Sequence, residues 1–403
     1  MGITPERTIA INEIAWDYWR YQATTDEDWT RDYLARRGLR GIQPGRAPDS
    51  WDRMVKTLRK KGVDDAELEA AGLARRSGSG AIGDFFRDRL VLPIRNQDDR
   101  IIGFTARRNP VNDPGPGEDG PPKYLNTATT PVFEKHQVLY GLDAAAVRRL
   151  AAGASPTIVE GALDVEAAKR AGPNYVPLAP LGTAITPAHL EVLRGIDATS
   201  IERLILAMDP DEGGVNATVR LWEMLDPVEA GEARAAVMPL DPADMLRYRR
   251  IPEMRAALDT ADPMSHVVVD HKLTGFRLDE IEGYVAAART ITSDLARLEP
   301  LPMARAAMHL AKGIGHEHLD LVIAETVTAV RGDRPVQEPQ RPAAEITPVR
   351  DVVADAVKVR TMNGHTTPLT PVRAAPSQEP GPAPPAHRTI AQQNPTQAPS
   401  QER

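Results

Sequence analysis

Acidic residues follow three short apolar runs in the middle of the chain, and this arrangement limits the folds that the chain can adopt. The acids and the runs before them are Glu160 after residues 157–159, Asp209 and Asp211 after residues 202–208, and Asp241 after residues 234–238. Short apolar runs bounded by turn residues are typical of buried strands in a parallel sheet. Ligands bind beyond the carboxyl ends of such strands, so we expect these acids to converge at one edge.

The same region alternates between predicted strands and predicted helices. The predicted strands are residues 157–160, 175–179, 202–208 and 234–238, and the predicted helices are residues 162–171, 186–195, 213–225 and a short one near Ala243. This alternation indicates an α/β fold, with a parallel sheet and right-handed crossover connections.

A cluster of carboxylates without nitrogen or sulfur ligands suits Mg²⁺ or Mn²⁺, and these ions suit phosphoryl transfer. Asp209 and Asp211 form an Asp-x-Asp pair that can share one or two ions. Asp164 and Asp241 are expected as outer members of the cluster. Each acid also has a simpler interpretation, because carboxylates are favourable as caps at helix N-termini.

Further motifs surround these acids along most of the chain. They are residues 33–39, 86–90, 102–104, 122–126, 139–142, 157–161, 181–184 and 207–211. In this order they resemble the catalytic core of bacterial DnaG-type primases, including its Toprim domain, from about residue 8 to about residue 331. The sequence departs from the family pattern at Pro210, where glycine is usual, and at Ala243, where a second acid is frequent. Asp244 stands one position further on, and its ability to replace that acid is left open.

The resemblance implies an α/β core in which a Toprim sheet is flanked by helices. It divides the chain into a helical and mixed N-terminal subdomain with the template groove, a Toprim catalytic subdomain and a helical subdomain. These cover residues 1–150, 151–250 and 251–334. Residues 335–403 are rich in Pro, Gln, Thr and Ala, a composition that buries too little apolar surface to fold, and we predict a disordered tail there.

The activity implied by the resemblance is synthesis of short RNA primers on single-stranded DNA from ribonucleoside triphosphates. The matching catalytic acids are Glu160, Asp209 and Asp211, and Mg²⁺ or Mn²⁺ is expected on these acids with Asp164 and Asp241. The matching nucleic-acid-binding residues are Arg37, Arg89, Arg107, Lys123, Tyr124 and Lys135. Cationic side chains bind phosphates, and an aromatic ring stacks on bases.

Two other classes of function stay open at this stage. One is another Toprim chemistry, such as strand cleavage by a nuclease or topoisomerase, against which the motifs at residues 122–126 and 139–142 argue. The other is a non-catalytic DNA-binding accessory of replication. Retention of all three catalytic acids argues against this second class.

Composition sets further limits on partners and location. The chain has no cysteine, which excludes a thiolate zinc site, although the resembled family usually carries a zinc ribbon. A separate zinc-ribbon module and a replicative helicase are therefore expected as partners. The formal net charge of −7 restricts DNA binding to local basic patches. No apolar run is long enough for a membrane span, so a cytoplasmic protein without a membrane partner is expected.

Overall fold

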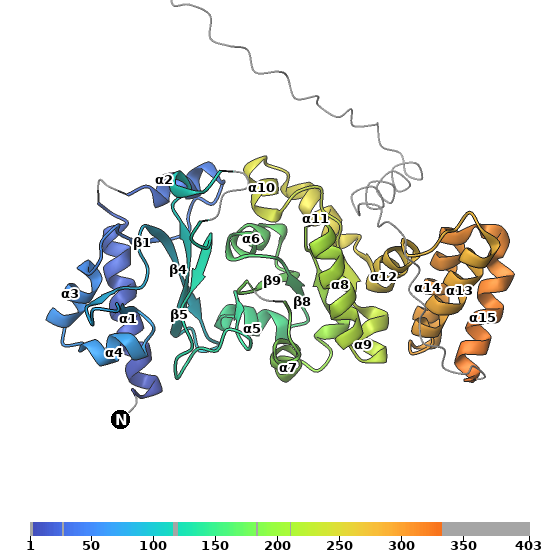
Figure 1. Cartoon of the computed structure of the whole chain (residues 1–403), viewed down its shortest axis with the longest axis horizontal. Coiled ribbons are helices and arrows are strands. Elements are labelled where there is room, and N and C mark those ends of the chain that lie inside the picture. Colours follow the sequence, from blue (N-terminus) through green and yellow to red (C-terminus); the bar gives the residue numbers. More distant parts are fainter. Residues whose placement is uncertain (1–2, 26–27, 116–119, 183, 210, 333–403) are drawn as a thin grey trace, which may run out of the picture. The chain divides into compact units, whose positions relative to one another are not determined.

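The computed structural model describes residues 3–25, 28–115, 120–182, 184–209 and 211–332 (Figure 1). All of them belong to one compact unit, which spans Met1–Ala356. The tail predicted to be disordered, residues 335–403, lies outside the described residues, as does Pro210.

The N-terminal part is built on an antiparallel four-stranded sheet in the order β1-β4-β5-β6. Its strands are β1 (Gly45–Ala47), β4 (Arg89–Arg95), β5 (Ile101–Arg108) and β6 (Tyr124–Asn126). Four helices and a small two-stranded sheet accompany it: α1 (Pro5–Gln22), α2 (Thr30–Arg36), α3 (Arg53–Lys60), α4 (Asp65–Ala70), β2 (Ala74–Arg76) and β3 (Ile82–Asp84).

Helix α1 packs on this sheet through tryptophan side chains. The Trp19 ring meets the edge of Phe104 with a centroid separation of 4.8 Å. A Cβ atom at Gly45 would stand 2.7 Å from the Trp16 ring, so only glycine lets β1 approach the helix this closely. The buried aromatic cluster fixes the sheet whose far edge, β6, reaches the candidate site.

The second sheet has six strands in the order β12-β11-β10-β8-β9-β7. They are β7 (Leu139–Tyr140), β8 (Ser155–Ile158), β9 (Tyr175–Pro180), β10 (Ile205–Leu206), β11 (Arg234–Ala235) and β12 (Asp262–Pro263). The middle four are parallel, as predicted, and the two edge strands are antiparallel. Each edge strand has only two residues, too short to show a period in the sequence.

Helices follow the strands of this sheet, and the sequence predicted those after β8, β9, β10 and β11. They are α5 (Ala144–Ala151), α6 (Ala162–Ala168), α7 (Pro187–Ile196), α8 (Glu212–Met224), α9 (Pro227–Glu232), α10 (Pro242–Arg247) and α11 (Ile251–Asp259). Short 3₁₀ turns occur at Pro110–Asn112, Lys169–Ala171, Ile201–Arg203 and His316–His318. Helix α9 is missing from the sequence prediction.

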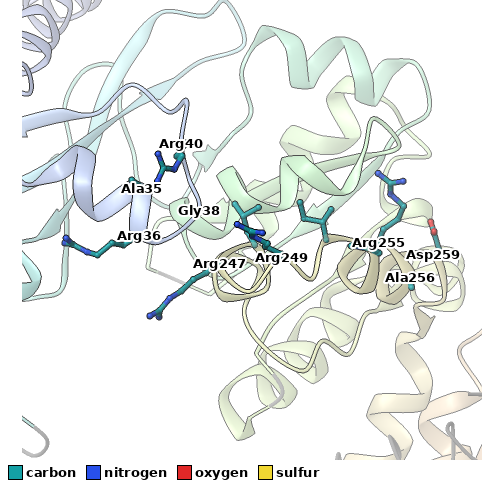
Figure 2. Close-up of a pocket in the computed structure, with 12 residues that line it drawn as sticks. Ala35, Arg36, Gly38, Arg40, Arg247, Arg249, Arg255, Ala256 and Asp259 are labelled. Carbon is teal, nitrogen blue, oxygen red and sulfur yellow. The ribbon is translucent and has the colours of Figure 1, made fainter. Parts of the chain in front are cut away.

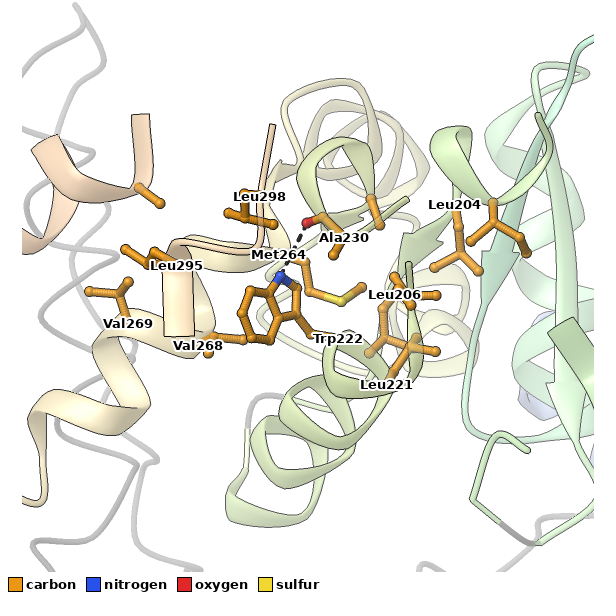
Figure 3. Packing of buried hydrophobic residues seen from close by; sticks show 14 of the residues in the cluster. Leu204, Leu206, Leu221, Trp222, Ala230, Met264, Val268, Val269, Leu295 and Leu298 are labelled. Carbon is orange, nitrogen blue, oxygen red and sulfur yellow. Dashed lines mark hydrogen bonds between the residues drawn. The ribbon is translucent and has the colours of Figure 1, made fainter. Parts of the chain in front are cut away.

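The last described segment is helical, as expected, and contains four helices. They are α12 (Met264–Leu273), α13 (Ile281–Leu295), α14 (Pro300–Ile314) and α15 (Leu319–Arg331). A continuous apolar cluster joins α12 to the sheet and α8, and Trp222 lies between Leu206 and Val268 in it (Figure 3). The Trp222 indole N–H donates to the carbonyl oxygen of Ala230 at 3.1 Å, so this buried polar group is satisfied. None of the helices in the described ranges is both long and apolar enough to cross a membrane.

Candidate active site

Glu160 and Asp209 follow neighbouring parallel strands of the six-stranded sheet. Strand β8 pairs with β10, with Ile158 opposite Leu206, so the chain leaves both strands at the same edge. Val159 and Ala207 continue inward and are almost fully buried, which anchors the acids that come after them. The carboxyl group of Glu160 lies close enough to that of Asp209 for its charge to act on Asp209. The predicted convergence of these two acids is thus present in the structure.

Two of the carboxyl groups have strongly shifted acidities. Burial, followed by the charge of Glu160, raises the pKa of Asp209 to about 7, and Asp241 and Asp211 add smaller contributions. Burial, followed by the charge of Asp241, raises the pKa of Asp164 to about 7, with Asp209 and Glu160 also acting on it. Like charges close together disfavour ionisation of all of them. Each of the five predicted acids therefore lies within electrostatic reach of others in the set.

Asp211 and Asp241 also cap helices, as the simpler interpretation proposed. The Asp211 carboxylate accepts a hydrogen bond from the Gly214 N–H at 2.9 Å at the start of α8. The Asp241 carboxylate accepts one from the Asp244 N–H at 2.6 Å at the start of α10. A Cβ atom at Gly214 would stand 2.0 Å from the Asp209 carbonyl oxygen, so this glycine lets α8 begin directly beside the acids. Capping and clustering thus occur together, because capping aims these acids at the sheet edge.

Asp244, whose ability to replace the acid that the family often has at Ala243 was left open, pairs with a basic residue in the structure. Its carboxylate accepts a hydrogen bond from Arg37 Nη1 at 2.8 Å. Ala243 is fully buried, and its N–H donates to Asp164 Oδ1 at 3.3 Å. The Arg37 guanidinium, predicted to bind nucleic acid, is thereby held against the start of α10, 3.8 Å from Asp241.

Within the described residues, no three acidic or histidine side chains stand in an arrangement that would hold a metal ion as they are. The donor set nonetheless fits a hard divalent cation, since all five groups offer oxygen. The raised pKa values of Asp164 and Asp209 record a mutual repulsion, which a cation between the carboxylates would relieve.

Lys123, Tyr124 and Lys135, which were predicted to bind nucleic acid, differ in their surroundings. Tyr124 begins β6, and its pKa is raised by burial and then by the neighbouring Tyr33 and Asp164. Lys123 is exposed. Lys135 Nζ donates to the Gly182 carbonyl oxygen at 3.3 Å, in the loop that follows β9. Tyr124 thus lies near the acidic edge, and Lys135 contacts the loop that follows β9.

Arg89 and Arg107 have other partners than the prediction assumed. Arg89 is 6% exposed and donates to the backbone carbonyls of Ala106, Pro122 and Lys123. Arg107 is 7% exposed, and its Nη2 bonds Asp113 at 2.8 Å. Both guanidinium groups therefore hold the β5–β6 region together, and they leave Lys123 as the exposed cation of this strand.

A group of arginines that sequence reasoning missed lines a pocket of about 770 Å³ between the end of α2 and helices α10 and α11 (Figure 2). We call it the arginine pocket; its cationic residues are Arg36, Arg40, Arg247, Arg249 and Arg255. These positions are more than 200 residues apart at the extremes, so no local motif reveals them. The only local signal is the run of basic residues with one tyrosine at 247–250.

Two family models match the chain. The N-terminal domain of the DNA primase catalytic core matches residues 18–146, and the Toprim domain matches residues 155–240. The DNA primase of Mycolicibacterium smegmatis is 33% identical over 338 residues, which cover 81% of this chain and 52% of that protein. The chain thus spans about half the length of the curated relatives that it matches.

Solved structures agree with the sequence comparisons. The RNA polymerase domain of Mycobacterium tuberculosis primase DnaG, in complex with double-stranded DNA, has 31% identity and a TM-score of 0.66, covering 77% of this chain and 99% of that domain. A DnaG primase catalytic domain bound to single-stranded DNA has 25% identity and a TM-score of 0.61, covering 77% of this chain and 96% of that domain.

Proposed function

Because the chain belongs to the family of DnaG-type primase catalytic cores, we propose that it synthesises short RNA primers on a single-stranded DNA template. The observation that carries the proposal is the meeting of two elements. Asp164, which follows β8, is within electrostatic reach of Glu160 and Asp209 and also of Tyr124 at the start of β6. A strand held along the N-terminal sheet would therefore present its end to the carboxylates.

In this proposal Glu160, Asp209 and Asp211 hold Mg²⁺ or Mn²⁺, with Asp164 and Asp241 as outer ligands. When bound, such ions make a primer 3′-hydroxyl more acidic and neutralise the charge of the leaving pyrophosphate. The chain's own residues set the geometry. The caps at α8 and α10 orient Asp211 and Asp241, and Gly161 leaves room beside the Asp164 carboxylate.

Template binding is assigned to the exposed cations beside these acids. Lys123 and Lys135 contribute charge for phosphates, and the Tyr124 ring offers a surface for a base. Arg37 reaches the same region from α2, whereas Arg89 and Arg107 position the strand that carries Lys123. That a solved DnaG catalytic domain is bound to single-stranded DNA supports this part of the proposal.

We retain the division into residues 1–150, 151–250, 251–334 and 335–403 as part of the proposal. Ribonucleoside triphosphates as substrates, and a replicative helicase and a separate zinc-ribbon module as partners, also remain proposals. With no cysteine, this chain has no thiolate ligand of its own for zinc.

The decisive experiment is primer synthesis on single-stranded DNA with labelled ribonucleotides and either Mg²⁺ or Mn²⁺. We expect metal-dependent products from the full chain and none from Glu160→Gln, Asp209→Asn or Asp211→Asn. Asp279→Asn and Glu282→Gln are matched controls. Both acids are exposed in the C-terminal helical region, and these substitutions change the charge by the same amount as those in the site. Wild-type activity in all three site variants would refute the assignment.

The same preparations separate the two alternative classes. Metal-dependent cleavage of end-labelled single strands or relaxation of supercoiled DNA, in the absence of nucleotides, would indicate nuclease or topoisomerase chemistry. Binding of single-stranded DNA with no product under any metal would indicate a non-catalytic accessory.

A further inference from the structure

The arginine pocket concentrates positive charge in a chain whose net charge is −7. Five guanidinium groups and one carboxylate, Asp259, line it. The carboxylate is already engaged, because it accepts a hydrogen bond from the Tyr175 hydroxyl. The pocket is also lined by the apolar residues Leu246, Ile251 and Pro252. A concave surface with apolar residues and several cations suits a ligand that carries phosphates.

Most of these cations have no anionic partner. Among the residues that the structure describes, Arg36, Arg40 and Arg249 form no ion pair, and all three are exposed. Arg247 is 3.8 Å from Asp244, a contact that is long for an ion pair. Arg255 donates to the Ala171 carbonyl oxygen and is therefore tied to the fold. The unpaired groups are free to meet an anion from outside the chain.

The pocket is joined to the acidic cluster by one short helix. Helix α10 starts at its cap Asp241, within the cluster, and its last turn supplies Leu246 and Arg247 to the pocket. Six residues of α-helix are about 9 Å long at 1.5 Å per residue. A bound strand would bridge this interval with one or two nucleotides. The neighbouring residues Arg36 and Arg37 are likewise divided between the two sites. Arg37 bonds Asp244 at α10, and Arg36 lines the pocket.

A glycine fixes the two walls of the pocket against each other. Gly38 has a φ of +76°, and a Cβ atom there would stand 3.3 Å from both the side chain and the carbonyl oxygen of Leu246. The chain can therefore turn directly after α2 and bring Arg40 alongside α10. The pocket is in this way set by the backbone, although its arginines are at the surface.

We propose that the arginine pocket binds the phosphate backbone of a single nucleic-acid strand whose neighbouring nucleotides occupy the acidic cluster. The inference rests on the proposed polymerase function. Tyr248, which caps the end of α10 and is 56% exposed, offers a ring for stacking beside the pocket. Cations along a groove combined with an exposed aromatic ring are the pattern of single-strand binding. A free nucleotide would need fewer cations and a closer fit than this open surface gives.

The test compares two variants that lose the same charge. The pocket variant is Arg36→Gln/Arg40→Gln/Arg249→Gln, which spares Arg255 because of its backbone bond. The control is Arg148→Gln/Arg220→Gln/Arg305→Gln, whose arginines are also exposed and form no ion pair within the described residues. Fluorescence anisotropy would measure binding of labelled DNA and RNA oligonucleotides of one sequence, without divalent metal, over a series of salt concentrations.

We expect the pocket variant to lower the slope of log affinity against log salt by roughly 2, at about 0.7 for each phosphate that is no longer neutralised. At about 0.1 M salt the affinity should fall on the order of tenfold or more, whereas the control keeps most of the wild-type slope. A loss for DNA alone identifies the bound strand as template, and a loss for RNA alone identifies it as product. Both results support the proposal.

Equal slopes in the pocket variant and the wild type would overturn the inference, as would equal losses in pocket and control variants. The inference would also be wrong if the pocket variant bound free nucleotide more weakly than the wild type, inorganic triphosphate removed this difference, and strand binding was unchanged. The pocket would then be a nucleotide site. Primer synthesis by the same wild-type preparation separates the two levels. If the wild type is active and the pocket variant binds as the wild type does, only the pocket proposal is refuted. If the wild type is inactive, the polymerase proposal is refuted, and the binding comparison still tests the pocket.

Discussion

The acidic cluster and a histidine pair in the C-terminal helices both bring together groups that repel each other when charged. The cluster places the carboxyl groups of Glu160 and Asp209 close together at the sheet edge. The pair stacks His266 of α12 on His309 of α14, with ring centroids 4.1 Å apart and planes within 4°. Burial is the first cause of the pKa shift at both sites, and a like charge is the second.

The two sites differ in what relieves the repulsion. His309 Nε2 is 2.7 Å from Asp270, while His266 Nε2 is buried without a hydrogen-bond partner. One ring thus keeps an anion and the other stays neutral, so the pair needs nothing from outside. Glu160 and Asp211 are exposed and have no cation beside them in the cluster, as far as the described residues extend. Crowded like charges therefore indicate a ligand site only where they face solvent and no internal partner neutralises them.

Exchanging single groups at the two sites should separate function from packing most strongly. We expect Asp209→Asn to lower primer synthesis by at least roughly 100-fold, because it removes a negative group from the metal site. His266→Phe, which preserves a stacked ring, should leave synthesis within about twofold, since it lies outside the proposed site. A rate assay with saturating template tests both. Equal losses in the two variants would mean that the acidic cluster has no special role.

Metal should stabilise one site and leave the other unaffected. A ligand that binds only the folded chain at about 100 times its Kd adds about 2.7 kcal/mol of stability. We expect Mg²⁺ or Mn²⁺ to raise the melting temperature of the wild type by several degrees, to do so equally in His266→Phe, and to have little effect on Asp209→Asn. Differential scanning fluorimetry with a metal titration provides the measurement. A full shift in Asp209→Asn would place the metal elsewhere.

Of the two sites compared, the acidic cluster is the one that the sequence predicts. Apolar runs predicted the four parallel strands, and order along the chain predicted that Glu160 and Asp209 meet, because parallel strands end at one edge. The polar turn at residues 96–99 between two apolar runs likewise predicts the hairpin of β4 and β5. The partners of individual basic side chains are not evident from the sequence. Arg89 was predicted to bind nucleic acid, and in the structure its guanidinium group donates hydrogen bonds to the backbone carbonyls of Pro122 and Lys123.

The arginine pocket and the histidine pair were missed for the same physical reason. Arg36 and Arg249 become neighbours only when α2 packs beside α10, and His266 meets His309 only through the packing of α12 on α14. Neither pair has a period or motif that local sequence displays. Asp244 is a similar case, because the sequence left its role open and its contact with Arg37 is visible only in the structure.

The histidine pair should make stability depend on pH. Burial and then His309 lower the pKa of His266 from 6.5 to about 4, so protonation favours the unfolded chain. The stability is therefore complete above about pH 6.5 and is lost as pH falls towards 4. The other charged groups acting on this ring are Asp262, Asp270 and Lys312.

Between pH 7 and pH 4.5, the free energy of unfolding should fall by roughly 1–2 kcal/mol less in His266→Phe than in the wild type, as urea denaturation at the two pH values would show. His318→Phe is the control, because that ring stacks on Tyr284 at 3.9 Å instead of on a second histidine. If the wild type and His266→Phe showed the same pH dependence, the pair would contribute nothing to acid sensitivity.

The smallest expected effect extends the contrast between exposed and neutralised charge to the template side. Lys123 is exposed. The Arg89 guanidinium group, in contrast, donates hydrogen bonds to backbone carbonyls, including that of Lys123 itself. Lys123→Ala should therefore lower the salt slope of single-stranded DNA binding by roughly 0.7, at unchanged melting temperature. Arg89→Gln should leave the salt slope unchanged and lower the melting temperature, because buried backbone carbonyls lose their hydrogen-bond donor. A salt titration of both variants, each paired with a thermal melt, decides between them. If Arg89→Gln changed the slope as much as Lys123→Ala without destabilising the chain, exposure would not be what distinguishes a DNA contact from a structural arginine in this sheet.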